Sequence, residues 1–263
     1  MKTAAFFDLD KTILGTTSSL AFTKPLYDQG LIKRADVVRS AYRQFIFTIG
    51  NADHNQTDKM REYLSALVTG WQVEQLQNIV NESLNDVVMP TAHAEALELI
   101  ARHKREGRDV IIVSASGSEI VTPVAALLGA DDCIATELES VNGIYTGDIT
   151  FYAYGENKAT AMREYAEQHG YNLQESYAYS DSVTDLPMLE VVGRPAVVNP
   201  DTQLRTIARE RGWPVLTFEK PAALKRPIID DPEQRKQAAA AVGVLALVVT
   251  WYLRRRKKKR SIA

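Results

Sequence analysis

The chain has 263 residues, of which 45% are hydrophobic and 24% charged, with a formal net charge of −2. This length predicts one or two domains with a substantial core, and the composition excludes a disordered chain and a multi-span membrane protein. The single cysteine, Cys133, cannot form an internal disulfide, and no secretory signal pattern opens the chain, so we expect the folded part to lie in the cytoplasm.

Apolar segments with β-forming residues alternate with helical segments along most of the chain. The expected strands are residues 3–9, 109–115, 134–138, 176–179 and 196–199. The expected helices are residues 91–105, 119–128 and 158–169, which end close to Gly107, Gly129 and Gly170. This alternation predicts an α/β fold with a parallel sheet flanked by helices. Residues 139–151, with Asn142-Gly143 between alternating residues, predict a hairpin that leaves the sheet.

The first two expected strands are separated by about 100 residues, far more than a crossover helix needs. Apolar periodicity in residues 35–49, 57–68 and 73–87 predicts two to four helices in this insertion. We therefore expect a helical cap at residues 16–88 and a core domain formed by residues 1–15 and 89–218. In the cap, Tyr42, Arg43 and Phe47 are candidates for substrate selectivity, although packing in the core is their simpler role.

The C-terminal region has a different composition. Residues 219–237 contain three prolines and many charges, which is typical of a linker. Residues 238–253 carry no charge and are apolar on every helical face, and Trp251 and Tyr252 stand where interfacial aromatic residues belong. This apolar helix predicts a membrane anchor, although about 24 Å of helix is short for a hydrocarbon layer of about 30 Å. It either spans the bilayer or lies in its interface, and a helix packed on the domain is the alternative.

Residues 254–263 form a basic tail that begins RRRKKKR and holds seven of the 31 basic residues. The rest of the chain has 24 basic residues against 33 acidic ones, and such a body binds nucleic acid poorly. A basic block after an apolar helix is typical of binding to anionic lipid. We therefore expect an anionic membrane surface as a partner, no nucleic acid, and attachment to the membrane through the C-terminus.

Asp8 and Asp10 follow the first expected strand, and Thr12 comes shortly after them. Open α/β sheets place their sites at the carboxyl ends of the strands. Two carboxylates there can converge on one cation while an oxygen stays free for attack. An acidic pair alone is equally typical of a solvated turn, so this interpretation needs support from other segments.

Three later segments give that support. Ser114 ends the second strand, where its hydroxyl would bind a phosphate oxygen or simply cap the next helix. Lys158 begins a helix, an unfavourable place for a cation unless an anion compensates it, although a surface lysine is the simpler view of this residue alone. Asp181 and Asp185 follow the fourth strand. In order and type, the four segments predict a magnesium-dependent phosphoryl-transfer site.

These segments resemble the four motifs of the haloacid dehalogenase (HAD) superfamily of phosphatases: DxDxT, a strand-end Ser or Thr, a lysine, and DxxxD. The resemblance covers about residues 3–200, and the helical insertion is similar to that of the subgroup with phosphoserine phosphatase. The strings AFFDLDKT, VSASGSE, YGENKA and YSDSVTDLPML are similar to HAD-IB hydrolases of actinobacteria, many of which carry a C-terminal membrane segment. The resemblance implies a Rossmann-like core with a helical cap of the C1 type.

The resemblance also implies the roles of the site residues. Asp8 would be the nucleophile that forms an aspartyl-phosphate, and Asp10 the general acid and base. Mg²⁺ would be held by the carboxylates of Asp8 and Asp181 and the carbonyl of Asp10, with Thr12 and Asp185 supporting these ligands. Ser114 and Lys158 would hold the phosphoryl group. Electrostatics agrees, because clustered carboxylates repel a phosphate unless a divalent cation and a lysine neutralise them.

A different alignment of the first motif makes Asp10 the phosphorylated residue. Asp10-Lys11-Thr12 resembles the DKTG phosphorylation site of P-type ATPases, but Ile13 stands in place of the glycine. A pump also needs several membrane spans, and this chain offers at most one. Asp8 therefore remains the expected nucleophile.

The substrate class follows from departures from the family motifs. Thr17 occupies the position at which phosphoserine phosphatases bind the substrate's amino group with an acidic residue. Ser114-Ala115-Ser116 replaces Ser-Gly-Gly, and SDSVTD replaces GDGxND, which looks more like the branch that includes phosphatidylglycerophosphate phosphatases. We expect a lipid-linked or membrane-proximal phosphomonoester. The alternatives are a soluble small-molecule phosphatase of the phosphoserine phosphatase type and a membrane-tethered phosphotransferase or regulatory scaffold.

Overall fold

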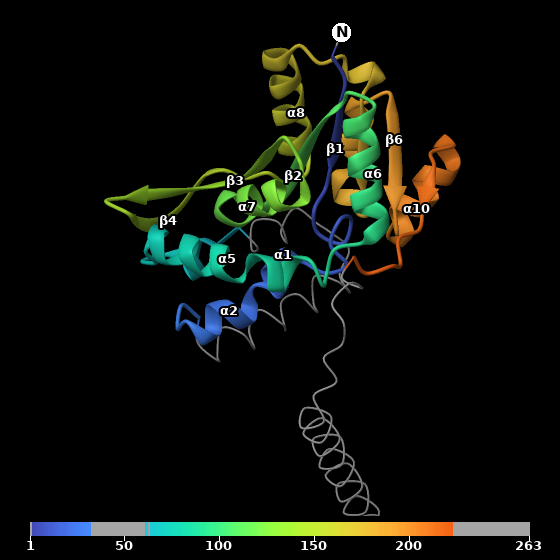
Figure 1. Cartoon of the computed structure of the whole chain (residues 1–263). Coiled ribbons are helices and arrows are strands. Elements are labelled where there is room, and N and C mark those ends of the chain that lie inside the picture. Colours follow the sequence, from blue (N-terminus) through green and yellow to red (C-terminus); the bar gives the residue numbers. More distant parts are fainter. Residues whose placement is uncertain (1, 33–60, 63, 223–263) are drawn as a thin grey trace, which may run out of the picture. The chain divides into compact units, whose positions relative to one another are not determined.

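A computed structural model describes residues 2–32, 61–62 and 64–222 of the chain (Figure 1). The chain divides into two units, residues 1–223 and 224–263, and the second lies outside the described residues. None of the helices in the described part of the chain has the length and apolarity needed to cross a membrane. Several expected features lie outside the described residues: the helical run 35–49, most of the linker, the apolar segment 238–253, the basic tail, Tyr42, Arg43 and Phe47.

A seven-stranded sheet forms the centre of the first unit, with the strand order β4-β3-β2-β1-β5-β6-β7. The strand bounds are β1 Ala4–Phe7, β2 Asp109–Gly117, β3 Asp132–Val141, β4 Ile144–Phe151, β5 Tyr177–Ser180, β6 Arg194–Val198 and β7 Val215–Leu216. All neighbouring pairs are parallel except β3 with β4. The predicted α/β fold with a mainly parallel sheet is therefore confirmed.

Every residue of β1 is buried, as a parallel strand covered on both faces requires. Because side chains alternate along a strand, Ala5 and Phe7 belong to the core on one face of the sheet and Ala4 and Phe6 to the core on the other. Burial of each phenylalanine contributes about 1.5–3 kcal/mol. This fully buried strand anchors the loop that carries Asp8.

Helices cover both faces of the sheet (Figure 1). On the Phe7 face they are α6 Ala94–Arg105 and α7 Ser118–Leu128, and α5 Val73–Val88 packs on α7. On the Phe6 face they are α8 Glu156–His169, α9 Leu186–Val191 and α10 Thr202–Arg211. Two short 3-10 helices, Leu173–Glu175 and Val183–Asp185, flank β5. Gly129 and Gly170 end α7 and α8 in the left-handed conformation, as their positions predicted.

The hairpin formed by β3 and β4 confirms the tight turn at Asn142-Gly143, where both residues have positive φ. The expected hairpin at residues 139–151 starts earlier than predicted and stays hydrogen-bonded to the sheet through β3. This strand pairs with β2 up to Thr136 and only with β4 from Glu137 to Val141, so that β4 becomes the edge strand. The strand runs on because its second half keeps a hydrogen-bonding partner.

The described part of the insertion is helical. It contains α1 Ser18–Ala21, α2 Thr23–Asp28, a helical stretch at residues 64–68, and α5. Helix α5 packs against α2 and against α7 of the core, so the insertion rests on the sheet's helical layer close to the second strand. This places α1, the first element of the insertion, next to the carboxyl ends of the strands (Figure 1).

The C-terminal part of the described chain contains elements that the sequence pattern did not predict, namely α10 and β7. The first residues of the expected linker are bound to the domain. Lys220 accepts a backbone hydrogen bond from Ala94 at 2.7 Å, and Ala222 donates one to Ala92 at 2.7 Å. Residues 220–222 therefore belong to the domain, because the start of α6 offers unpaired backbone groups for them to bind.

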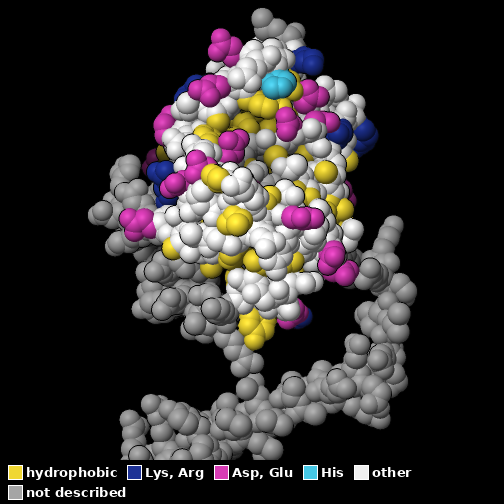
Figure 2. Space-filling view, turned by 90° about the vertical axis from the view of Figure 1, so that its left-hand side faces the viewer, with side chains coloured by type: hydrophobic (Ala, Val, Ile, Leu, Met, Phe, Trp, Pro, Cys, Tyr) yellow, Lys and Arg dark blue, Asp and Glu magenta, His cyan; other side chains and the backbone are white. Residues whose placement is uncertain are grey.

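Figure 2 shows one face of the molecule, on which acidic side chains are spread over the described surface between apolar ones. This distribution agrees with the excess of acidic residues that remains when the terminal basic block is set aside.

Candidate active site

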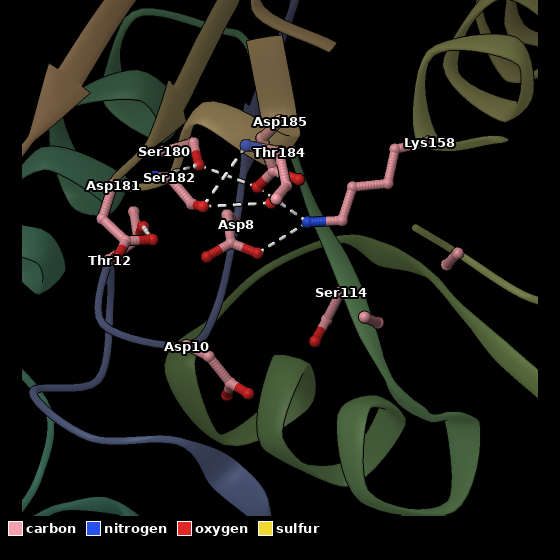
Figure 3. A network of polar contacts seen from close by, with 12 residues as sticks. Asp8, Asp10, Thr12, Ser114, Lys158, Ser180, Asp181, Ser182, Thr184 and Asp185 are labelled. Atoms are coloured by element: carbon pink, nitrogen blue, oxygen red, sulfur yellow. Dashed lines mark hydrogen bonds and ion pairs between the residues drawn. The ribbon is translucent and has the colours of Figure 1, made fainter. Parts of the chain in front are cut away.

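The carboxyl ends of β1, β2 and β5 bring three of the predicted motifs to one edge of the sheet. β1 pairs with β2 on one side and with β5 on the other, so Asp8, Ser114 and Asp181 leave neighbouring strands in the same direction. The backbone N–H of Asp8 extends the pairing with β5 by donating to the carbonyl of Tyr179 at 2.9 Å. Figure 3 shows the resulting group of polar side chains.

Lys158 connects two of these motifs. Its side chain reaches from the first turn of α8, and Nζ lies 2.8 Å from Asp8 Oδ1 and 2.9 Å from Asp185 Oδ2 (Figure 3). The lysine is 2% exposed. The two carboxylates outweigh the effect of burial and raise the pKa of Lys158, so the ammonium group stays charged. The compensating anion that its helix position suggested is therefore present.

Residues at the end of β5 and in the loop that follows it also position Asp185. Ser180 Oγ donates to Asp185 Oδ2 at 2.7 Å, and the side chain of Ser182 caps the 3-10 helix Val183–Asp185 by accepting from the N–H of Thr184. These bonds shape the loop so that Asp185 points at Lys158. Asp181 and Asp185 lie close enough for the charge of Asp185 to raise the pKa of Asp181.

Asp8 and Asp181 carry perturbed carboxyl groups. Burial is the main cause, and repulsion from neighbouring carboxylates adds to it: the pKa of Asp8 is raised to about 7 although Lys158 opposes the change. The pKa of Asp181 is raised to about 8 by burial and by the charges of Asp8 and Asp185. Thr12 Oγ1 donates to Asp181 Oδ1 at 3.4 Å and so joins the first motif to the fourth.

Asp10 has a separate partner. Its Oδ1 accepts from the backbone N–H of Ser18 at 2.8 Å. Burial raises the pKa of Asp10, against the effect of the hydrogen bonds from Ser18. Lys11, which follows Asp10, has a φ of 61°, so the chain turns sharply directly after the two aspartates.

Ser114 is buried in the second half of β2, where its Oγ accepts from the N–H of Ser116 at 3.2 Å. Thr136 of β3 fixes the next residue by donating to the carbonyl of Ala115 at 2.7 Å. The second motif therefore lies in the last residues of β2, where the pairing with β3 is irregular between Ser114 and Gly117, and α7 begins at Ser118.

The site holds more negative than positive charge, which is what a divalent cation would balance. Burial and mutual repulsion raise the pKa values of Asp8 and Asp181, and one buried lysine serves Asp8 and Asp185. Within the described ranges, no three His, Cys, Asp or Glu side chains form a group that could hold a metal ion. The predicted magnesium site would not form such a group, because only Asp8 and Asp181 contribute side chains and Asp10 contributes its carbonyl. Carboxylate and carbonyl oxygens are donors that fit Mg²⁺.

Sequence reasoning did not single out several residues of this site. Ser180 and Ser182 stand on either side of Asp181 in the fourth motif. Their position next to an aspartate at the end of a strand could have identified them as site residues. Ser116 was visible only as a departure from the glycine of the family motif, and Ser18 left no signal. The contact between them depends on how the insertion leaves the core.

Comparison with known proteins identifies the family. The model of the haloacid dehalogenase-like hydrolases matches residues 5–190. A probable phosphatase of Mycobacterium tuberculosis is 56% identical over 85% of this chain and 78% of the relative. A phosphoserine phosphatase of the same species is 34% identical over 82% of this chain and 70% of the relative. A histidinol-phosphatase of Neisseria meningitidis is 32% identical over 83% of this chain and 100% of the relative.

Among solved structures, a protein of unknown function from Bordetella pertussis superposes with a TM-score of 0.72 and 31% identity, over 82% of this chain and 98% of that one. The family model thus spans most of the chain, and the relatives are matched over most of their own length. The chain therefore belongs to the haloacid dehalogenase-like hydrolases and is a phosphatase of their phosphoserine phosphatase-like group.

Proposed function

We propose that the chain is a magnesium-dependent phosphomonoesterase that acts through an aspartyl-phosphate on Asp8. The observation that carries this proposal is the ammonium group of Lys158, 2.8 Å from Asp8 Oδ1, inside a buried cluster of carboxylates. A cation placed against the attacking carboxylate reduces the repulsion between two anions, the phosphate and Asp8. A purely structural ion pair would not need the further carboxylates of Asp10 and Asp181 at the same strand ends.

In the first step of the proposed reaction, a carboxylate oxygen of Asp8 attacks the phosphorus atom. The bond from phosphorus to the ester oxygen breaks, and the leaving alkoxide takes its proton from the carboxyl group of Asp10. In the second step, Asp10 accepts a proton from water, and the water oxygen attacks the phosphorus of the aspartyl-phosphate. Phosphate leaves and the Asp8 carboxylate is restored. The burial-raised pKa of Asp10 favours a group that exchanges a proton in both directions.

Further residues would hold the reacting groups. Ser114 and Lys158 would bind the phosphoryl oxygens, because a buried hydroxyl and an ammonium group are donors of the required kind. The carboxylates of Asp8 and Asp181 and the carbonyl of Asp10 would hold Mg²⁺, which would neutralise charge on the phosphate. Asp185 orients Lys158, and Thr12 orients Asp181, by the hydrogen bonds described above.

For the substrate we propose a lipid-linked or other membrane-proximal phosphomonoester. Residues 238–260 supply the supporting pattern of an apolar helix and a basic block, which would keep the catalytic domain on the cytoplasmic membrane surface. Enzyme and lipid confined to one surface meet at a higher effective concentration. Thr17 gives further support, because it caps α1 by accepting from the N–H of Leu20 and brings no carboxylate for an amino group.

A soluble small-molecule phosphatase is the second candidate. It is favoured by relatives named for phosphoserine and for histidinol phosphate, each at least 32% identical to this chain. These two relatives are named for different substrates. Similarity to them therefore supports phosphate ester hydrolysis more strongly than it supports any particular ester. A phosphotransferase remains a variant of the same chemistry, with an acceptor alcohol in place of water.

The test is phosphate release from phosphoserine, glycerol phosphate, phosphatidylglycerophosphate and lysophosphatidic acid, with Mg²⁺ or EDTA. Wild type is compared with Asp8→Asn, and with Asp148→Asn as a matched control on the exposed hairpin. We expect magnesium-dependent release from the lipid esters, lost in Asp8→Asn and kept in the control. Preference for phosphoserine would overturn the lipid assignment, and full activity of a folded Asp8→Asn protein would overturn the mechanism. If product forms only with an added alcohol acceptor, the enzyme is a phosphotransferase, and inactivity on all esters favours a regulatory scaffold.

A further inference from the structure

Ser18 lies at the point where the insertion leaves the core. It is 0% exposed and is the first residue of α1. The first N–H groups of a helix have no partner within the helix. Thr17 Oγ1 accepts from Leu20, and the N–H of Ser18 donates instead to Asp10 Oδ1 at 2.8 Å. A helix start therefore supplies a fixed donor to one oxygen of the Asp10 carboxyl group.

The hydroxyl of Ser18 makes a second connection. Ser18 Oγ lies 2.6 Å from Ser116 Oγ, at the short end of the range for O–H···O hydrogen bonds. The N–H of Ser116 in turn donates to Ser114 Oγ at 3.2 Å. Ser116 stands where the family motif has glycine, which offers no side-chain hydroxyl. A continuous set of hydrogen bonds thus runs from Asp10 through Ser18 and Ser116 to Ser114.

We propose that Ser18 is a positioning residue for Asp10, and that Ser116 ties this arrangement to the loop that carries Ser114. The proposal rests on the proposed function, in which Asp10 protonates the leaving alcohol. With Oδ1 held by Ser18, the other carboxyl oxygen is directed to the departing ester oxygen. The connection also makes the geometry of Asp10 depend on the placement of α1, the entry to the helical insertion.

A positioning role has a signature that a structural role lacks. Proton donation matters most when the leaving group is a poor one, so loss of position must slow the hydrolysis of alkyl phosphates more than that of aryl phosphates with acidic phenols. The parameter kcat/KM reports only the steps up to departure of the alcohol. It therefore measures proton donation by Asp10 separately from the later role of Asp10 as a base. Glycerol phosphate and p-nitrophenyl phosphate are suitable probes.

Ser18→Pro is the sharpest variant. Proline is well tolerated at the first position of a helix, and Thr17, with φ −82° and ψ 142°, already has the extended conformation preferred before proline. The ring removes the N–H and displaces the Asp10 carboxyl group. Ser18→Ala and Ser116→Ala remove only hydroxyls and keep the test valid if the proline variant fails to fold. Ser19→Ala, on the exposed face of the same helix, is the matched control.

We expect Ser18→Pro to lower kcat/KM for glycerol phosphate by about 100-fold and for p-nitrophenyl phosphate by no more than about threefold. The two alanine variants should show the same selectivity at about tenfold, and Ser19→Ala should match wild type. Equal losses on both esters, or no loss on either, would overturn the positioning role. Failure of the proposed function is a different result: folded Asp8→Asn would then keep the activity of wild type on both esters.

Discussion

Lys158 and Asp8 form an ion pair 2.8 Å long, with side chains that are 3% and 8% exposed. They are 150 residues apart in sequence and come from α8 and the end of β1. Buried ion pairs of this kind bring little net stability, because the desolvation of both groups opposes their attraction. The presence of this buried pair agrees with a role in chemistry, and removing its cation has a measurable effect on stability.

Lys158→Met should destabilise the fold by about 3–5 kcal/mol, because it leaves Asp8 and Asp185 buried without their cation. Urea denaturation in EDTA measures this change. The control is Lys24→Met, which removes an exposed ion pair with Asp28 and should cost less than about 0.5 kcal/mol. In a double-mutant cycle, adding Asp185→Asn should recover part of the loss. Equal, small effects of the two lysine variants would contradict the buried ion-pair network.

Magnesium should stabilise the protein in a pH-dependent manner. The folded-state pKa values of Asp8 and Asp181 are raised from 3.8 to about 7 and about 8. Between pH 4 and pH 8 these two groups therefore hold protons in the folded protein that the unfolded chain has released, so their contribution to the free energy of unfolding of the metal-free protein falls as pH rises. Mg²⁺ competes with these protons and should raise the melting temperature more at pH 8 than at pH 5.

Thermal unfolding in EDTA and in Mg²⁺ at the two pH values tests this prediction. Asp181→Asn should flatten the pH dependence in EDTA and reduce the stabilisation by Mg²⁺, whereas Asp148→Asn should change neither. The same gain from Mg²⁺ at both pH values would place its binding elsewhere on the protein.

His103 should make the protein sensitive to acid. Its Nδ1 accepts from Arg108 Nε at 2.7 Å, so Nε2 carries the proton and donates to the Tyr179 hydroxyl at 2.8 Å. Burial and the charges of Arg108 and Arg102 lower the pKa of His103 to about 4. The unfolded chain binds a proton near pH 6.5, so the stability that neutral His103 contributes is lost as pH falls from 6.5 to 4, by up to about 3 kcal/mol.

Urea denaturation across this pH range measures the slope. His103→Gln should lower stability at neutral pH and reduce the slope, while His169→Gln, at an exposed position, should leave the slope unchanged. A slope unaltered in His103→Gln would assign the acid sensitivity to other groups.

Position 193 requires glycine because the backbone of Gln174 passes too close for a side chain. A Cβ atom at this position would lie 1.9 Å from the carbonyl oxygen of Gln174. Gly193→Ala should therefore cost about 3 kcal/mol or more by forcing the backbone to move. Gly212→Ala is the control: its φ is +67° and no atom would lie within 4 Å of the new Cβ, so the cost should be the left-handed strain of about 1 kcal/mol. Similar melting temperatures for the two variants would contradict this account.

Deletion of residues 238–263 should abolish membrane binding. We expect the full chain to co-sediment with vesicles that contain anionic lipid and the shortened chain to stay in the supernatant, still hydrolysing soluble esters. Replacement of the basic residues in 254–260 by glutamine should weaken binding most at low salt, since electrostatic attraction is screened by salt. Co-sedimentation of the shortened chain would overturn the anchor.

The sequence by itself determined the fold class, most of the sheet, and the motif residues at the strand ends. These features follow from local patterns, because the alternation of apolar strands and helices defines a parallel sheet, and parallel strands end at a common edge. The local pattern is therefore sufficient to assign Asp8, Ser114 and Asp181 to neighbouring positions at that edge.

Only the tertiary structure decided which side chains meet within this edge. The bonds from Lys158 to Asp185, from Ser18 to Asp10 and between the hydroxyls of Ser18 and Ser116 join segments whose relative orientation depends on helix packing. The same holds for the continuation of β3 beyond residue 138 and for the binding of residues 220–222 to the start of α6. Such contacts depend on distances of a few tenths of an ångström between distant segments, which local residue preferences do not encode.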